Sequence, residues 1–271
     1  MAIDPHLLWA IGHALLLVGS FKVGLSSLFF RGTSAWWYKT SFSGAMASYA
    51  IVCLKSVGSP TSQPPLEYAQ KALLDENVQY LVLAVYWWIS KPIPLTLLPY
   101  ATFSLFHTLT FLRSNLIPKF FPPSAHKAPA AAAGTPASVQ PKAAPERISR
   151  AIQLWVKANY DTAMKFVAYV ELVILLRVTL GALLFQNSFL APIFYAHFIR
   201  LRYYHSAFTR SAVDNITARS DKIVANQAPA VQKGYGIFKN VVQKWAGSIL
   251  ARNDGAAPAA AGTAPNTGRA R

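Results

Sequence analysis

The chain alternates long apolar runs with short polar breaks. Six apolar runs follow one another, at Leu7–Phe30, Ala35–Val57, Val78–Ile89, Leu95–Leu112, Phe166–Phe185 and Phe189–Ile199. At about 1.5 Å per residue, the first run is long enough to cross a hydrocarbon core of about 30 Å, and the later ones are shorter. Short turns join the runs in pairs, which predicts an all-α polytopic membrane protein with three helical hairpins. A soluble helical protein with a large buried core is the alternative interpretation.

Composition divides the rest of the chain into segments. Alanine and proline dominate two stretches that bury too little apolar surface to fold, so we expect them to be disordered. The predicted order is a membrane region with two hairpins, an Ala/Pro-rich linker, a third hairpin with a basic-aromatic motif and a polar helix, a basic amphipathic helix and a disordered tail. These segments cover residues 1–117, 118–146, 147–226, 231–252 and 253–271.

Charge narrows the possible partners. Charged residues make up 13% of the chain, against about 25% in soluble domains, and the net charge is +16. Few acidic residues are present to neutralise the cations, so we expect the chain to bind anionic phospholipid. No nucleic-acid-binding fold is recognisable, and nucleic acid is not predicted as a partner.

The distribution of charge predicts the orientation in the membrane. Residues 113–165 carry eight Lys or Arg and two acids, and residues 200–252 carry nine and two. Basic loops stay in the cytosol, which places both termini there as well. Asn215 begins a glycosylation sequon, so a glycan on native Asn215 would contradict this orientation.

The last predicted helix, residues 231–252, has one apolar face. At about 100° per residue, a single arc of the helix holds seven apolar residues, namely Val231, Tyr235, Phe238, Val241, Val242, Trp245 and Ile249. Lys233 and Lys244 lie on the opposite side and Lys239 flanks the stripe. This pattern is typical of a helix lying in a membrane interface. Packing against the protein's own soluble part, or docking to an acidic partner, would use the same face.

Two charged residues interrupt the fifth apolar run. Each ionised group at the centre of a bilayer costs roughly 2.5–3.5 kcal/mol, so Glu171 and Arg177 require a partner, a polar cavity or a shallow position. Six positions, about 600°, separate them, so they do not share a helix face. We expect a shallow hairpin in which both side chains reach water, and a substrate path in a transporter is the alternative.

No residue pattern typical of catalysis is present. His13, His107 and His197 lack the spacing of metal ligands, so no metal site is predicted and the histidines are expected to pack. Phosphate-binding loops and nucleophile motifs are also missing from the sequence. We therefore expect a protein that is not an enzyme and needs no cofactor.

Two stretches resemble a known family. They are Val78 to His107, centred on the turn Lys91-Pro92-Ile93-Pro94, and Phe194 to Arg210. Both are similar to motifs of the eukaryotic family that contains the fungal pore-membrane proteins of the nuclear envelope and the animal transmembrane protein thirty-three of the endoplasmic reticulum. The Ala/Pro-rich linker departs from the family pattern as an insertion.

The resemblance implies a non-enzymatic protein of the endoplasmic reticulum and nuclear envelope. It implies roles in tubular membrane shape and in nuclear pore distribution or assembly, with reticulon-type membrane proteins and nucleoporins as partners. The family's basic-aromatic motif corresponds here to Arg200, Arg202, Tyr203, Phe208 and Arg210. We hypothesise that these residues contact lipid headgroups or a partner.

Three functions follow as hypotheses. The first is membrane shaping, because hairpins with small luminal tips and an in-plane helix both add area to the cytosolic leaflet. The second is an adaptor whose basic C-terminal region recruits soluble factors, such as a nuclear transport receptor. The third is a transporter or lipid-modifying enzyme that uses Glu171, Arg177 and His197.

Overall fold

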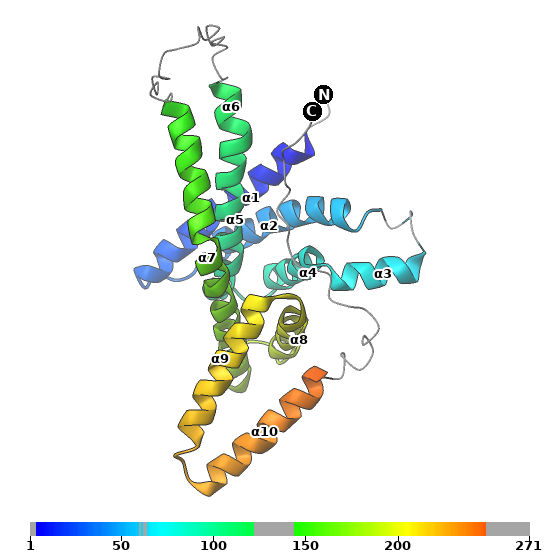
Figure 1. Ribbon diagram of the computed structural model, residues 1–271, viewed down its shortest axis with the longest axis vertical. Helices are drawn as coiled ribbons and strands as arrows, with labels where there is room; N and C mark the ends of the chain where they lie inside the picture. Colours follow the sequence, from blue (N-terminus) through cyan, green and yellow to red (C-terminus); the bar gives the residue numbers. More distant parts are fainter. Residues whose placement is uncertain (1–3, 60, 62–63, 122–143, 248–271) are drawn as a thin grey trace, which may run out of the picture. The chain divides into compact units, whose positions relative to one another are not determined.

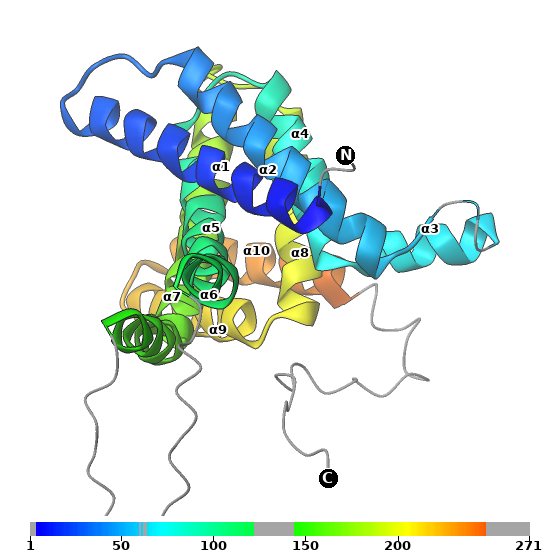
Figure 2. The same cartoon turned by 90° about the horizontal axis from the view of Figure 1, so that it is seen from above.

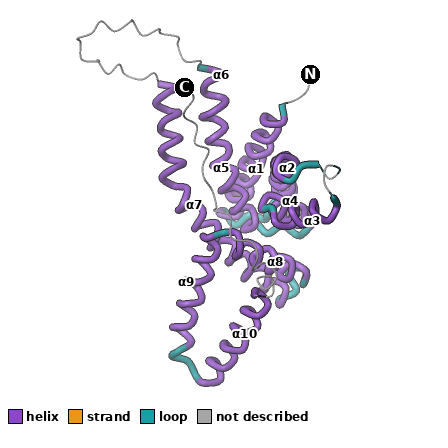
Figure 3. Tube along the Cα trace, turned by 45° about the vertical axis from the view of Figure 1, so that its right-hand side comes forward, coloured by secondary structure: helices purple, strands orange, loops and turns teal. Residues whose placement is uncertain are grey.

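The computed structural model describes residues 4–59, 61, 64–121 and 144–247, and every regular element within these ranges is helical (Figure 1). The elements in chain order are α1 (Pro5–Leu28), α2 (Ala35–Ser56), α3 (Pro65–Leu74), α4 (Glu76–Ile89), the 3₁₀ turn η1 (Pro94–Thr96), α5 (Leu97–Phe111), the π-helical turn η2 (Leu112–Leu116), α6 (Ile117–Phe120), α7 (Ala144–Leu183), α8 (Leu190–His205), α9 (Ala207–Val224) and α10 (Pro229–Gly247). The tube view shows the same succession of helices (Figure 3). The predicted all-α membrane fold is confirmed.

The chain divides into two compact units within α9. The first unit ends at Val213 and holds the predicted hairpins, and the second begins at Asp214 and holds the end of α9 together with α10. The predicted tail, residues 253–271, and most of the predicted linker lie outside the described residues. Helical structure reaches Phe120 and resumes at Ala144, so it covers both edges of the segment predicted as a linker.

Small residues bring α1 and α2 into close contact, side by side (Figure 2). A Cβ on Gly44 would lie 2.5 Å from the carbonyl oxygen of Gly12 and 3.0 Å from the backbone nitrogen of Leu16, so only glycine fits there. The hydroxyl of Ser48 donates a hydrogen bond of 2.8 Å to the carbonyl of Trp9 across the helix pair. Close packing through small residues is how helices associate in lipid, and it accounts for the predicted first hairpin.

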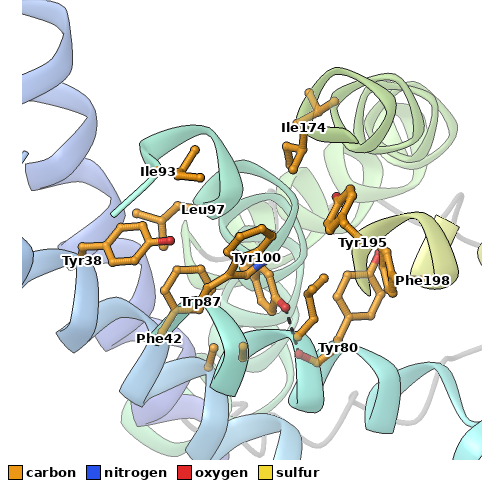
Figure 4. Packing of buried hydrophobic residues seen from close by; sticks show 14 of the residues in the cluster. Tyr38, Phe42, Tyr80, Trp87, Ile93, Leu97, Tyr100, Ile174, Tyr195 and Phe198 are labelled. Carbon is orange, nitrogen blue, oxygen red and sulfur yellow. Dashed lines mark hydrogen bonds between the residues drawn. The ribbon is translucent and has the colours of Figure 1, made fainter. Parts of the chain in front are cut away.

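The second predicted hairpin is more open than expected. α4 packs mainly on α2, and α5 packs mainly on α1 and α7. Large rings fill the space between α4 and α5, with the ring centroids of Tyr80 and Tyr100 5.5 Å apart. The Tyr100 hydroxyl donates a 2.9 Å hydrogen bond to the carbonyl of Tyr80 (Figure 4). The two arms are therefore joined through aromatic side chains and not through close backbones.

The third hairpin is built on the longest helix. α7 has 40 residues, or about 60 Å, and it joins the basic residues that follow the linker to the fifth apolar run without a break. α8 folds back against α7 after the turn at Gln186-Asn187-Ser188. Asn187 stabilises the turn, since its Nδ2 donates a 3.0 Å hydrogen bond to the carbonyl of Val178 near the end of α7.

Two helix ends share an unusual feature. Phe30 follows the end of α1 and Phe185 follows the end of α7, and both adopt left-handed backbone conformations, with φ of 52° and 56°. The same pair of backbone hydrogen bonds closes both helices. At the end of α1, the N–H of Arg31 donates to the carbonyl of Ser26 at 2.8 Å and the N–H of Phe30 to that of Ser27 at 3.2 Å. At the end of α7, the N–H of Gln186 donates to the carbonyl of Gly181 at 2.7 Å and the N–H of Phe185 to that of Ala182 at 3.0 Å. Glycine is the usual residue at this position of the helix-ending motif, so a phenylalanine there is disfavoured by the backbone.

An aromatic core joins helices from all three hairpins (Figure 4). Its largest buried side chains are Tyr38, Phe42, Trp87, Tyr100 and Tyr195. The Tyr38 hydroxyl shares a 2.8 Å hydrogen bond with the hydroxyl of Thr96, which ties α2 to η1.

Within the part of the chain that the structure describes, length and apolar composition together mark three helical stretches as able to cross a membrane. They are Pro5–Leu28, Pro94–Phe120 and Ala144–Leu183. Each of the three predicted hairpins contributes one such stretch, and its other arm, α2, α4 or α8, does not meet both criteria. The result agrees with a multi-pass membrane protein.

Candidate membrane-binding surface and buried ion cluster

The apolar stripe predicted for the C-terminal helix is exposed on α10. Phe238 is 65% exposed, and exposed apolar side chains on the same side include Val231, Val241, Val242 and Trp245. Ile237 is also exposed and widens the stripe beyond the predicted arc. Ile249 lies outside the described residues. An uncovered stripe of this kind is the form expected of an interfacial helix.

A carboxylate on α9 holds α10 by the edge of that stripe. Asp221 accepts hydrogen bonds from the Tyr235 hydroxyl at 2.8 Å and from the Lys239 ammonium at 2.9 and 2.8 Å. The hydrogen bonds from Lys239 and then from Tyr235 lower the pKa of Asp221 below its usual value. Tyr235 and Lys239, both predicted to bind membrane, contact α9, while Lys233 and Lys244 are exposed. The contact orients α10 so that its apolar face remains uncovered.

The basic-aromatic motif does not form one surface. Arg210 is exposed, Arg200, Tyr203 and Phe208 are half-buried, and Arg202 is buried. The hypothesis that Arg202 contacts headgroups or a partner is therefore wrong in this structure, because its guanidinium points into the protein. The remaining four residues stay available to that hypothesis.

Arg202 belongs to a buried ion cluster. Its Nη1 lies 2.7 Å from Oε2 of Glu76, whose side chain is 46% exposed, and its Nε lies 3.8 Å from Oε2 of Glu171. The second distance fits an ion pair but is too long for a hydrogen bond. The hydroxyl of Tyr80 donates a short hydrogen bond to Oε1 of Glu171. The guanidinium also lies over the Tyr80 ring, 5.5 Å from its centroid. The cluster thus joins α4, α7 and α8.

The expectation that Glu171 reaches water is also wrong. Its exposed fraction is 0%, and the charge of Arg202 compensates its carboxylate. Burial of an unpaired carboxylate is costly, so this pairing is what makes Glu171 tolerable inside the helical core. The signal for this pairing in the sequence was the pair of arginines in the last turns of α8, Arg200 and Arg202, which are other cations besides Arg177 on the same helix as Glu171.

Arg177 lies six residues before the end of α7. Its side chain is exposed near the end of α7, and a Cβ on Gly181 would lie 2.5 Å from its Nη1. The guanidinium therefore extends along α7 toward the turn with α8. Arg177 and Glu171 take no part in a common site.

Two histidines meet on the α1–α5 contact. His13 is buried and its Nδ1 lies 2.8 Å from the hydroxyl of Ser104, and its ring centroid is 4.7 Å from that of His107. His197 is exposed on α8. Among the described residues, no three His, Cys, Asp or Glu side chains gather as a metal would require. His13 and His107 therefore take part in packing between α1 and α5.

These features define an all-α multi-pass membrane protein with a charged core cluster and exposed apolar side chains along α10. The family model described as Transmembrane protein 33/Nucleoporin POM33 matches residues 3–247, and the chain belongs to this family.

Curated relatives agree with this assignment. Nucleoporin POM33 of Chaetomium thermophilum is 36% identical over 83% of this chain and 79% of its own length. Tetra-spanning protein 1 of Schizosaccharomyces pombe is 31% identical over 90% and 85%. The Pore membrane protein of 33 kDa of Saccharomyces cerevisiae is 27% identical over 85% and 80%. No solved structure matches the chain.

Proposed function

We propose that this chain is a non-enzymatic protein of the endoplasmic reticulum and nuclear envelope that stabilises curved membrane and contributes to nuclear pore distribution or assembly. Both termini face the cytosol in this proposal. The observation that carries it is the exposed apolar stripe of α10, in a family that includes a protein named as a nucleoporin. The names of the relatives support the pore membrane as the site of action.

The physical basis is area added to one leaflet. An inserted α10 occupies the outer part of the cytosolic leaflet, with its lysines toward anionic headgroups and its rings among the upper acyl chains. The Asp221 contact favours insertion because it orients the helix before it meets the lipid. Area added to one leaflet favours bending toward that side.

The curvature proposal can be tested with the full chain in anionic liposomes. Phe238→Glu places a charge in the stripe, and Gln243→Glu places the same charge on the opposite face, where the exposed side chain already meets water. We expect the native chain and Gln243→Glu to tubulate vesicles or to enrich on narrow tubes, and Phe238→Glu to do neither. Equal behaviour of the two variants would contradict the proposal.

An adaptor role is the second candidate. Its support is the exposure of Lys233, Lys244 and Arg210 together with the net charge of +16. An acidic soluble partner, such as a nuclear transport receptor, would bind the lysines and leave vesicle shape unchanged. A Lys233→Gln/Lys244→Gln variant that no longer binds a purified receptor, but still tubulates vesicles when its concentration is raised to offset weaker insertion, would separate the two roles.

A further inference from the structure

The α7–α8 turn combines three features that water does not explain. Phe185 takes the left-handed position that usually belongs to glycine and is nevertheless 82% exposed. The apolar side chains around it, Leu183, Leu184, Phe189 and Leu190, are exposed as well. From Val178 to Ile199 the chain contains no Asp, Glu, Lys or Arg. A turn with these apolar side chains exposed is less stable in water than in an apolar medium.

The arms of this hairpin are short when measured from the ion cluster. Glu171 precedes the end of α7 by twelve residues, and Arg202 follows the start of α8 by twelve. Each arm is therefore about 18 Å long, against a hydrocarbon core of about 30 Å. The cluster itself lies at a polar boundary, because Arg202 binds the half-exposed Glu76 at the first residue of α4.

The turn that follows α4 lies beside the α7–α8 turn. α4 has 14 residues, or about 21 Å from Glu76 to Ile89. Tyr86, Trp87 and Lys91 line a cavity of about 190 Å³ together with Phe185 and Ser188 of the α7–α8 turn. Two turns from separate hairpins therefore meet at a similar distance from the ion cluster.

The first hairpin provides the contrast. Phe30 has the same backbone conformation and is 98% exposed, but α1 has 24 residues, or about 36 Å. Arg31, Gly32, Thr33 and Ser34 follow at once, and all are polar or small. This turn has the length and the polarity to reach water on the far side, with Phe30 at the headgroup boundary.

From this contrast we infer that the α7–α8 hairpin is re-entrant: its turn ends among the acyl chains of the far leaflet and does not emerge into water. Lipid acyl chains contact the turn through Phe185 and its apolar neighbours. This inference rests on the proposed function as a membrane protein, and it makes the hairpin a wedge of fixed depth. Arg177 and Lys91 are the cations that extend from this region toward headgroups.

Single cysteines test the depth of the turn. In a Cys53→Ser background, which removes the one native thiol, Thr33→Cys and Ser188→Cys mark the two turns. Both Thr33 and Ser188 lie in turns, and Ser188 is exposed, so packing within the protein does not hide a thiol at position 188. The full chain is inserted in microsomes and treated with a membrane-impermeant maleimide before and after the vesicles are opened.

We expect the position-33 thiol to react only after opening, and the position-188 thiol to react from neither side until detergent dissolves the membrane. A fluorophore at position 188 should also be quenched by phosphatidylcholine spin-labelled on its acyl chains. Reaction at position 188 that matches position 33 would overturn the inference. That outcome leaves the curvature proposal intact, because vesicle tubulation is measured separately.

Phe185→Gly gives a second test, which uses the same fluorophore at position 188. Glycine relieves the left-handed backbone, so a turn in water would keep its position or gain stability. In a re-entrant hairpin, the loss of the apolar ring should reduce quenching at position 188 by the spin-labelled acyl chains. Unchanged quenching in this variant would count against Phe185 as the lipid-contacting side chain.

Discussion

The two units of this protein place charge and apolar surface in opposite ways. In the first unit, Glu171 and Arg202 are buried where apolar side chains would be expected. In the second unit, Phe238 and Trp245 are exposed where polar side chains would be expected. In each unit, a second group offsets the unfavourable placement of these side chains. A countercharge on another helix offsets the first, and a lipid surface is proposed to offset the second.

Charged residues therefore have different roles in the two units. A charge inside the first unit fixes how helices pack, because it must find one specific partner. Charges on the second unit act collectively, since exposed lysines respond to the field of an anionic surface and to salt.

The largest effect should come from breaking the buried cluster. Arg202→Met leaves Glu171 without its countercharge and should destabilise the first unit by roughly 3–5 kcal/mol, the range for one partner lost from a buried ion pair. Thermal unfolding of the purified full chain in detergent measures it. Arg210→Met, which removes an exposed arginine, is the matched control and should be nearly neutral. Equal stability of the two variants would remove the cluster as a structural element.

A smaller effect should follow from crowding the first hairpin. Gly44→Val forces a side chain against the Gly12 carbonyl and should cost about 1–3 kcal/mol. Gly24 has no neighbour within 4 Å of the position of a Cβ, so Gly24→Val makes the same change in open space. The difference in unfolding temperature between these variants measures packing alone. No difference would mean that α1 and α2 do not approach so closely.

In the second unit, we expect modest and salt-dependent effects. An environment-sensitive fluorophore on Val242→Cys, in the Cys53→Ser background, reports insertion of the stripe, and one on Gln243→Cys reports the opposite face. Lys233→Gln with Lys244→Gln should lower the insertion equilibrium on anionic vesicles by about 1 kcal/mol per lysine, or roughly fivefold each. Neutral vesicles should show no change. An effect that persists at high salt would contradict an electrostatic role.

The smallest effect should be a loss of the α9–α10 contact in acid. Because the pKa of Asp221 is lower in the folded unit than in an unfolded chain, its stabilisation is present above the ordinary aspartate pKa of about 3.9. It is lost as the pH falls through the lowered value. Lys239 gives the opposite sign, since its pKa is raised by the hydrogen bond to Asp221 and its contribution is lost at high pH. Hydrogen exchange of α10 across this range measures the opening, and Asp221→Asn should abolish the acid transition.

Sequence predicted the parts of the fold that depend on local pattern. Apolar runs and turn residues located the hairpins, and the one-sided arrangement of apolar residues located α10. Sequence did not predict that α7 runs unbroken through the change from basic to apolar residues, because a helix needs only continuous hydrogen bonding and tolerates such a change. It also failed to predict that α4 and α5 separate, because that follows from the volume of the tyrosine rings between them.

The candidate site shows the same division. The exposed stripe could be predicted because a helical period is a property of one segment. The pairing of Glu171 with Arg202 could not, since it depends on how α7, α4 and α8 meet. The contact of Asp221 with Tyr235 and Lys239 likewise joins residues 14 and 18 positions apart across a turn. Both are tertiary contacts between groups that look solvated in the sequence.

The unbroken course of α7 has a mechanical consequence. One half of this helix is apolar and packs against α8, and the other half is basic and lies alongside the α5–α6 helix (Figure 1). A continuous helix transmits rotation along its length, so a tilt of the apolar half in a thinner or more strongly bent bilayer must swing the basic half through a matching arc. Under the proposed membrane function, the orientation of the basic half therefore follows the tilt of the apolar half.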